Sequence, residues 1–454
     1  MNDTEGFLLG GLVTVIFLAL LIYLFYKHPR SKRMEALGFT HWGPFLFWKT
    51  KRGRDFLARL ATKERFWRWY GTVAIVACLG AAFVITGLLL WQSVLVMEVP
   101  AESAPTPQMV LGLPGLNPLI PLWYGIFGLV VAIVVHEFAH GILTLAAKMK
   151  VKTMGIVFLV VPIGAFVEPD EEELGRAERR ARMRMYAAGP ATNMGFALIF
   201  AVIFSMVFMA AVQPAHAGVG ITRVDPGTPA YGTMEAGMIL VSLNGTETAT
   251  SNDFKEAMNA TRAGQRVNMT VYQREQGTEP YNISVVLGDR GNYYPNEDGA
   301  SGKGYLGVIS TTTSTDIYHP LSASKDISEV PSRVLVYIFL PMAHLSPIQD
   351  PTTDFYAVQG PLAALPPDVF WVLANACYWA FWINLMVGLT NVMPAVPLDG
   401  GFLFRDWLDI VLEKVGYKER VKGGRQLLID KIVTGLSLLI LFLILWQFIG
   451  PRLF

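Results

Sequence analysis

The chain has 454 residues, of which 52% are hydrophobic and 16% are charged, whereas soluble domains average roughly 25% charged residues. This composition indicates a polytopic α-helical membrane protein and excludes an ordinary soluble domain. The formal net charge of +1 argues against a nucleic-acid partner, because such proteins carry a basic face or stripe. Both cysteines, Cys78 and Cys377, lie in apolar runs. We expect them to be buried apolar side chains rather than a disulfide or metal ligands.

Apolar runs of about 20 residues predict about six transmembrane helices. Residues 1–26 contain the first run, which follows an acidic N-terminus and precedes basic residues, so we expect a retained anchor rather than a signal peptide. Between Lys27 and Arg68 twelve Lys or Arg residues stand against three acids, and the positive-inside bias therefore predicts a basic cytoplasmic loop over residues 27–71. The expected later spans are residues 72–97, 120–147, 185–212, 369–392 and 432–449.

The third expected span carries an unusual polar sequence, His136-Glu137-Phe138-Ala139-His140. Ionisable side chains are costly in lipid and by default mark a functional site. Two histidines four positions apart lie on one helix face and can bind one metal ion. Glu137 is adjacent and can move a proton to or from a bound water, which is the H-E-x-x-H arrangement of zinc proteases. A structural zinc site is the weaker alternative, because such sites usually include cysteine.

The segment after this span, residues 151–167, is apolar and rich in β-branched side chains, but Gly155, Pro162 and Gly164 interrupt it. We expect a membrane-associated β segment near the metal site, since irregular backbone at membrane depth must line a cavity or be covered by protein. The charged stretch from Glu168 to Arg184 is expected to form an interfacial helix with a solvated face.

Residues 213–328 alternate short β-type runs with turns, which predicts a small β-rich domain. Glycosylation sequons occur only in segments that charge places outside the cytoplasm, so we expect this domain to be extracytoplasmic. The sequons begin at Asn2, Asn244, Asn259, Asn268 and Asn282. Strands are expected over residues 218–224, 238–243, 266–273 and 281–287, and a helix over 251–262 with Ser251 as its N-cap. Residues 329–368 are expected to be an interfacial linker.

A third metal ligand is needed, because a catalytic zinc typically has three protein ligands and an open water position. Asp399 follows a segment broken by Pro394 and Pro397 and precedes two glycines. Taken alone, this pattern fits an ordinary helix-terminating turn better than a ligand, but together with the histidine pair we favour a ligand. The expected catalytic membrane core comprises residues 118–212 and 369–402, and residues 403–454 form a cytoplasmic loop and the last span.

Three motifs in this order resemble the site-2 protease family of intramembrane zinc metalloproteases. They are His136 to His140, Gly189-Pro190-Ala191-Thr192-Asn193, and Asn391 to Gly401 with its Leu-Asp-Gly-Gly end. The resemblance implies that His136, His140 and Asp399 bind Zn²⁺ and that Glu137 is the general base. It also implies that Asn391 helps to hold the substrate. Asn193 is a candidate substrate-binding residue or a polar contact in helix packing.

The β-rich domain resembles a PDZ domain. The matching segments are residues 218–224, 227–230, 235–237 and 239–245, although Met238 stands where an acidic residue is usual. The resemblance implies either peptide binding by strand addition at a sheet edge or steric filtering of substrates.

The function these features predict is hydrolysis of peptide bonds within or near the transmembrane segments of membrane-anchored proteins, after a first extracytoplasmic cut. The expected partners are membrane-anchored protein substrates, a peptide or protein ligand of the PDZ-like domain and the lipid bilayer of a plasma or organelle membrane. One alternative is a non-proteolytic zinc-binding scaffold or receptor. A transporter is disfavoured, because transporters usually carry internal repeats and this sequence shows none.

Overall fold

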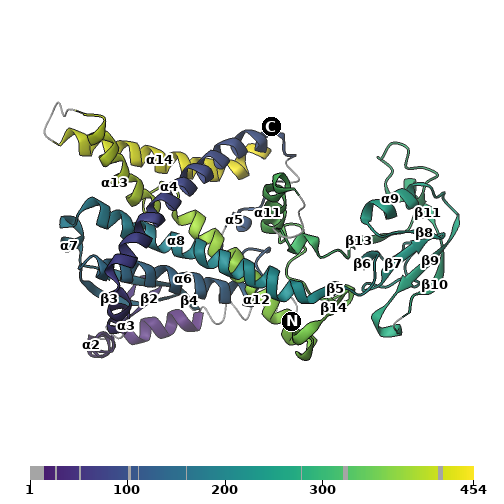
Figure 1. The fold of residues 1–454 in the computed structure, drawn as a ribbon, viewed down its shortest axis with the longest axis horizontal. Coiled ribbons are helices and arrows are strands. Elements are labelled where there is room, and N and C mark those ends of the chain that lie inside the picture. The colour runs from purple at the N-terminus through teal and green to yellow at the C-terminus, as the bar shows by residue number, and fades with distance from the viewer. Residues whose placement is uncertain are drawn as a thin grey trace. The chain divides into compact units, whose positions relative to one another are not determined.

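In the computed structural model the chain forms two compact units (Figure 1). The first comprises Met1–Ile199 and Trp379–Phe454, and the second comprises Phe200–Tyr378. The structure describes residues 15–25, 28–50, 53–100, 104–110, 112–159, 161–277, 279–320, 326–417 and 423–453.

Five helices in the described part of the chain are long and apolar enough to cross a membrane. Their large apolar side chains are often exposed, for example Trp91 at 63% and Trp123 at 78%, whereas soluble proteins rarely expose large apolar patches. The helices therefore identify a membrane protein. They are α4 (Glu64–Leu95), α6 (Leu122–Ala146), α8 (Arg179–Ile203), α12 (Pro367–Asn391) and α14 (Gly424–Ile449).

Each of these helices coincides with an expected span, although α4 begins at Glu64 rather than at residue 72. The remaining expected span, residues 1–26, is described only as a short apolar helix over Val15–Phe25. Residues 1–14 and residue 26 lie outside the described part of the chain, so the sixth span stays a prediction.

A four-stranded antiparallel sheet belongs to the first unit, in the order β1-β2-β3-β4. The extended structure predicted for residues 151–167 is confirmed as the hairpin of β3 and β4. Residues 27–71 are more ordered than the predicted loop, because they contain two helices and the other two strands. The elements are α2 (His28–Ala36), β1 (Phe39–Trp42), β2 (Phe45–Thr50), α3 (Arg54–Ala61), β3 (Val151–Leu159) and β4 (Val161–Pro169).

Close backbone approach explains how the N-terminal hairpin joins this sheet. Trp48 of β2 is opposite Ile156 of β3, and a Cβ at Gly155 would lie 2.2 Å from the Trp48 carbonyl oxygen. Only glycine therefore fits at this position. The following helix α3 inserts Leu57, which is fully buried, against Ala139 and Ile142 of α6. The basic segment thus supports the helix that carries the histidine pair.

The charged stretch from Glu168 to Arg184 does not form one interfacial helix, as the sequence predicted. It comprises the end of β4, the short helix α7 (Glu171–Arg176) and the start of α8. Asp170 ends the strand and caps α7, because its Oδ1 accepts hydrogen bonds from the backbone N–H groups of Glu172 and Glu173. These bonds lower the pKa of Asp170. After α12 the first unit continues with α13 (Asp399–Lys414).

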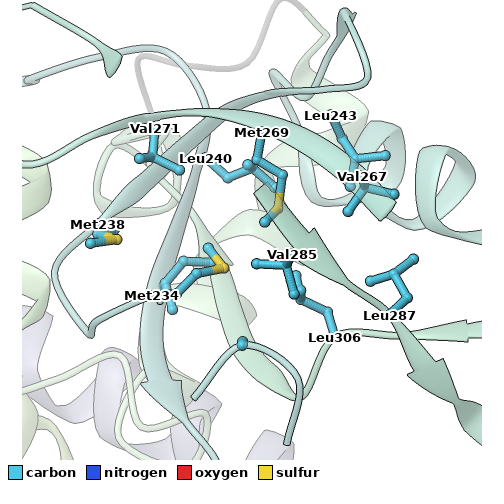
Figure 2. Packing of buried hydrophobic residues seen from close by; sticks show 12 residues of the cluster. Met234, Met238, Leu240, Leu243, Val267, Met269, Val271, Val285, Leu287 and Leu306 are labelled. Carbon is cyan, nitrogen blue, oxygen red and sulfur yellow. The ribbon is translucent and has the colours of Figure 1, made fainter. Parts of the chain in front are cut away.

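The second unit contains an antiparallel sheet in the order β10-β9-β7-β6-β13, with β8 paired to β7. We call residues 219–312 the β domain. Strand residues such as Leu240, Val267 and Met269 fill its core, together with Leu306 from a connecting segment (Figure 2). The four strands expected from the sequence are present as β6 (Val219–Val224), β7 (Ile239–Leu243), β9 (Arg266–Tyr272) and β10 (Tyr281–Val286).

The helix expected in this domain is α9 (Ser251–Asn259), but its N-cap is Thr250 rather than Ser251. Thr250 forms a capping box with Asp253: its hydroxyl accepts from the Asp253 N–H, and its own N–H donates to the Asp253 carboxylate. The sequence did not predict β8 (Thr246–Glu247), β11 (Gly288–Asp289), β12 (Gly304–Tyr305) or β13 (Val308–Thr312).

The rest of the second unit holds two strands that pair with each other and several short helices. The residues expected to form an interfacial linker therefore carry regular structure of their own. The two strands are β5 (Val212–Pro214) and β14 (Tyr356–Val358), and one of the helices is α11 (Val330–Phe339). The short helix α10 (Arg290–Tyr293) belongs to the β domain, and α5 (Pro107–Val110) lies in the first unit.

Candidate metal centre and active site

The three side chains predicted as metal ligands converge at one point in the first unit. His136 and His140 lie on one face of α6, and their Nε2 atoms are 3.0 Å apart. Asp399, the first residue of α13, places its Oδ2 atom 3.0 Å from His136 Nε2 and 3.2 Å from His140 Nε2. Both histidines are buried. Residues 259 positions apart in the sequence therefore form one cluster.

The donor set of this cluster fits a divalent metal ion. Two imidazole nitrogens and a carboxylate oxygen are the ligands of many catalytic zinc sites. A tetrahedral zinc with bonds of about 2.0–2.1 Å requires its donors to lie roughly 3.3 Å apart, close to the observed separations. Three lone-pair-bearing atoms this close together repel one another unless a proton or a cation lies between them.

The second nitrogen of each imidazole also has a partner, as is usual for metal-binding histidines. His140 Nδ1 lies 2.7 Å from the carbonyl oxygen of Met185. That carbonyl can only accept, so Nδ1 carries the proton and Nε2 is left as the ligand atom. The backbone of α8 thereby fixes the tautomer and the orientation of His140.

Asn193 plays the corresponding part behind His136. Its Nδ2 lies 3.3 Å from His136 Nδ1, while its Oδ1 is buried without a hydrogen-bond partner among the described residues. Turning the amide by half a rotation lets Oδ1 accept the proton of His136 Nδ1, which satisfies both atoms. Asn193 is fully buried. Its geometry therefore matches a residue that positions His136, which fits the polar contact in helix packing that the sequence analysis left open, and its role in substrate binding stays a prediction.

Gly189 is a further site residue, which the sequence motif indicated only as a packing position. A Cβ at this position would lie 2.5 Å from His140 Nε2 and 2.6 Å from His136 Nε2. Any side chain would therefore occupy the space that the two ligand atoms face. Glycine keeps this space open, and its place in the chain, four residues before Asn193, puts both positions on one face of α8.

Two more glycines explain how Asp399 reaches the cluster. A Cβ at Gly400 would lie 2.1 Å from the carbonyl oxygen of Val392, and a Cβ at Gly401 would lie 2.6 Å from the carbonyl carbon of Ala395. The chain therefore folds back tightly between the end of α12 and the start of α13. This turn presents the Asp399 carboxylate to α6.

Glu137 contacts the edge strand β4 of the sheet. Its Oε2 accepts a hydrogen bond of 2.8 Å from the backbone N–H of Val167 in β4. This contact confirms that the extended segment lies beside the site. It also orients the carboxylate, with one oxygen held by β4 and the other left for a second partner.

A cavity of about 340 Å³ adjoins the cluster. His136, Glu137, His140 and Asp399 all line it, and so does Asn391. Asn391 Nδ2 donates to the Val387 carbonyl oxygen of its own helix at 3.1 Å. The residue predicted to hold the substrate therefore lies at the cavity wall, and its role stays a prediction.

Comparison with known proteins agrees with this geometry. The profile of peptidase family M50 matches residues 124–429, a stretch that contains all the predicted site residues. The chain belongs to this family, the site-2 protease family. Membership makes it an intramembrane metalloprotease of the site-2 protease type. An uncharacterized protein of Methanocaldococcus jannaschii is similar as well, with 24% identity over 420 residues and 91% of each chain covered.

Proposed function

We propose that the protein is a zinc-dependent endopeptidase that cleaves membrane-anchored proteins within or near their transmembrane segments. The observation that carries the proposal is the convergence of His136, His140 and Asp399, with donor atoms 3.0–3.2 Å apart, next to Glu137. Both histidines lie on a helix of membrane-spanning length. In the proposed site these three side chains hold the metal ion.

In the proposed mechanism, different residues of the chain bind the metal ion, transfer the proton and orient the imidazoles. Bound zinc supplies Lewis-acid catalysis, which polarises a carbonyl group and acidifies water. Glu137 accepts a proton from the attacking water and passes it to the leaving amine. Its bond to the Val167 N–H keeps the carboxylate at the cavity. Asn193 and the Met185 carbonyl hold the two imidazoles in orientation.

A substrate helix must unwind before cleavage, because its carbonyl groups are engaged in i to i−4 hydrogen bonds. We infer that the unwound segment adds to β4. This strand pairs with β3 on one side, and no strand pairs with its other edge within the described residues. The Val167 N–H points from that edge to Glu137. Strand addition is a common way to bind an extended peptide.

Metal content tests the core of the proposal. Purified wild-type protein is expected to hold about one zinc per chain, and Asp399→Ala is expected to lose most of it. Asp430→Ala, which removes an aspartate of α14 that pairs with Arg405 at 2.7 Å, is the control for general damage. Wild-type protein without zinc, or full zinc in the Asp399 variant, would contradict the proposed ligand set. Zinc without cleavage of any membrane-anchored substrate would favour the scaffold alternative.

We further propose that the β domain is PDZ-like and binds a peptide end exposed by a first cut outside the membrane. A groove of about 270 Å³ lies between α9 and β13, and β13 is at the edge of the sheet. Phe254, Met258 and Leu306 give it apolar walls, while Lys255 and Lys303 give it positive charge. A peptide with an apolar last residue and a free carboxylate matches this groove.

Peptide binding to the full-length protein tests this second proposal. A peptide with a free C-terminal carboxylate should bind more tightly than the same peptide with a C-terminal amide. Lys303→Gln should remove the difference, whereas Arg223→Gln should keep it, because Arg223 pairs with Asp225 and does not line the groove described above. Equal binding of both peptides, or no binding, would favour a steric filter instead.

A further inference from the structure

A second cavity of about 340 Å³ lies directly beside the metal cavity in the first unit. Its lining is strongly charged and includes Arg182, Asp406 and Asp409 from α8 and α13. We call it the charged pocket. The two cavities share three lining residues, Leu174, Tyr186 and Phe402. These side chains therefore form the wall between a polar compartment and the metal site.

The wall consists mainly of two stacked aromatic rings. Tyr186 of α8 and Phe402 of α13 have ring centroids 5.3 Å apart and an interplanar angle of 20°. Both side chains are only partly buried, because each faces a cavity. Stacked rings form an apolar plate that water and ions do not cross without displacing a ring.

A partly buried ion pair lies next to this plate on the side of the charged pocket. Arg182 Nε lies 2.9 Å from Asp406 Oδ2, and Arg182 Nη2 lies 2.6 Å from Asp406 Oδ1. Such bidentate pairs fix geometry strongly. Arg182 precedes Tyr186 by four residues and Asp406 follows Phe402 by four. The ion pair therefore lies one helical turn from the two rings, on the same contact between α8 and α13. Arg179 and Asp409 form a second ion pair, with a distance of 3.1 Å, about one helical turn further along this contact.

The metal cluster holds the plate from the other side. Tyr186 follows Met185, whose carbonyl orients His140. Phe402 lies three residues after Asp399, which puts both on one face of α13. The two rings thus lie between the ion pairs of Arg179 and Arg182 and the metal ligands.

We propose that Tyr186 and Phe402 form an aromatic gate that controls the passage of water and small hydrophilic solutes between the charged pocket and the metal cavity. Hydrolysis consumes one water for each bond cut, while the outer surfaces of the spanning helices face lipid. The charged pocket is lined by ionised side chains and shares a wall with the metal cavity, so we expect water to reach the site from it. The role of the gate in supplying water rests on the proposed function, whereas the barrier itself can be tested without any measurement of cleavage.

The first test measures metal exchange in full-length protein reconstituted in lipid nanodiscs. Loading with zinc and removal by the hydrophilic chelator EDTA are followed as rates, together with the equilibrium affinity. Phe402→Ala should speed both rates several-fold and leave the affinity unchanged, because a gate affects passage and not the ligands. Phe402→Trp should slow both. Phe404→Ala is the matched control, since Phe404 packs on Trp407 and lines neither of these two cavities.

A second test does not depend on metal binding. Thr144 lines the metal cavity and is 1% exposed, so a Thr144→Cys variant, with both native cysteines replaced by alanine, reports access to that cavity. A charged thiol reagent should label it several-fold faster when Phe402→Ala is added, and not when Phe404→Ala is added. Unchanged labelling and exchange rates would overturn the gate. Faster labelling in a protein that holds no zinc would support the gate and reject the proposed function.

Discussion

The helix of the metal site and the sheet of the β domain distribute polarity in opposite ways. Helix α6 buries His136, His140 and Thr144 and exposes Trp123 and Phe127. Strand β9 buries every second residue, starting with the apolar Val267 and Met269, and exposes polar residues between them. The surroundings account for the difference. Lipid favours apolar side chains outside and confines ionisable groups to the interior, whereas a strand that faces water on one side shows the reverse pattern. In the first unit the candidate functional residues are therefore buried, whereas the buried residues of strand β9 in the β domain are apolar and contribute to stability.

The largest effect that sharpens this comparison is expected from Glu137→Gln. The amide cannot accept the proton from water, so cleavage of a membrane-anchored substrate should fall by about 10²–10⁴-fold. Zinc content should stay at the wild-type level, because Glu137 is outside the ligand cluster. Measuring both in one preparation separates the base from the ligands. Glu178→Gln, at an exposed glutamate, should change neither, and near-normal cleavage by the Glu137 variant would exclude it as the base.

The next effect contrasts two glycines on the same helix. Gly189→Ala should abolish tight zinc binding, since its Cβ would lie 2.5–2.6 Å from atoms of both imidazoles. Gly195→Ala has nothing within 4 Å of the new Cβ, so it should keep zinc and gain up to about 1 kcal/mol of helix stability. Zinc titration and thermal melting report the two quantities. Equal zinc binding by both variants would contradict the open space assigned to Gly189.

Stability in the β domain should respond to its core and not to metal. Leu240 is fully buried between strands, so Leu240→Ala should lower the free energy of unfolding of this domain by about 2–5 kcal/mol. Leu88, which α4 exposes at 46%, provides the contrast: Leu88→Ala should change stability by within about 0.5 kcal/mol. Denaturant unfolding followed by hydrogen exchange in each region distinguishes them. A larger loss at Leu88 than at Leu240 would reverse the comparison.

The smallest expected effect concerns Asn193. Removal of a group that orients a metal-binding histidine typically costs 10–100-fold in metal affinity, and we expect Asn193→Ala to lower zinc affinity by about that factor. Asn193→Asp retains an acceptor for His136 Nδ1 and should restore most of the affinity. Asn384→Ala is the control, because this buried asparagine donates to a carbonyl of its own helix. Unaltered affinity in Asn193→Ala would remove the residue from the metal centre.

Sequence patterns within one segment predicted those features of the structure that depend on that segment alone. The helix period places His136 and His140 on one face whatever the tertiary structure, and apolar length identifies the spans. Alternation likewise predicted β6, β7, β9 and β10. Asp399 was predictable only because the histidine pair demanded a third ligand. The site could thus be outlined from motifs that carry their own chemistry.

Contacts between distant segments were not predictable in the same way. The pairing of β2 with β3 joins residues about a hundred positions apart, and the sequence showed only a basic segment. A turn at Gly43-Pro44 between two aromatic runs was the available signal for that hairpin. The contact of Asn193 with His136 and the stack of Tyr186 on Phe402 depend on how α8 packs against α6 and α13. No periodicity within one segment reports such packing.

The hydrogen bond between the Val167 N–H and Glu137 fixes the position of the Glu137 carboxylate relative to β4. If substrates add to β4 as proposed, one strand both docks the substrate and holds Glu137, and the distance from a docked residue to Glu137 would follow the strand's own repeat of about 3.3 Å. The register in which a substrate pairs with β4 would then determine which of its peptide bonds is cut. An enzyme built in this way would select where to cut by register and by the ease of local unwinding, with little need to recognise particular side chains.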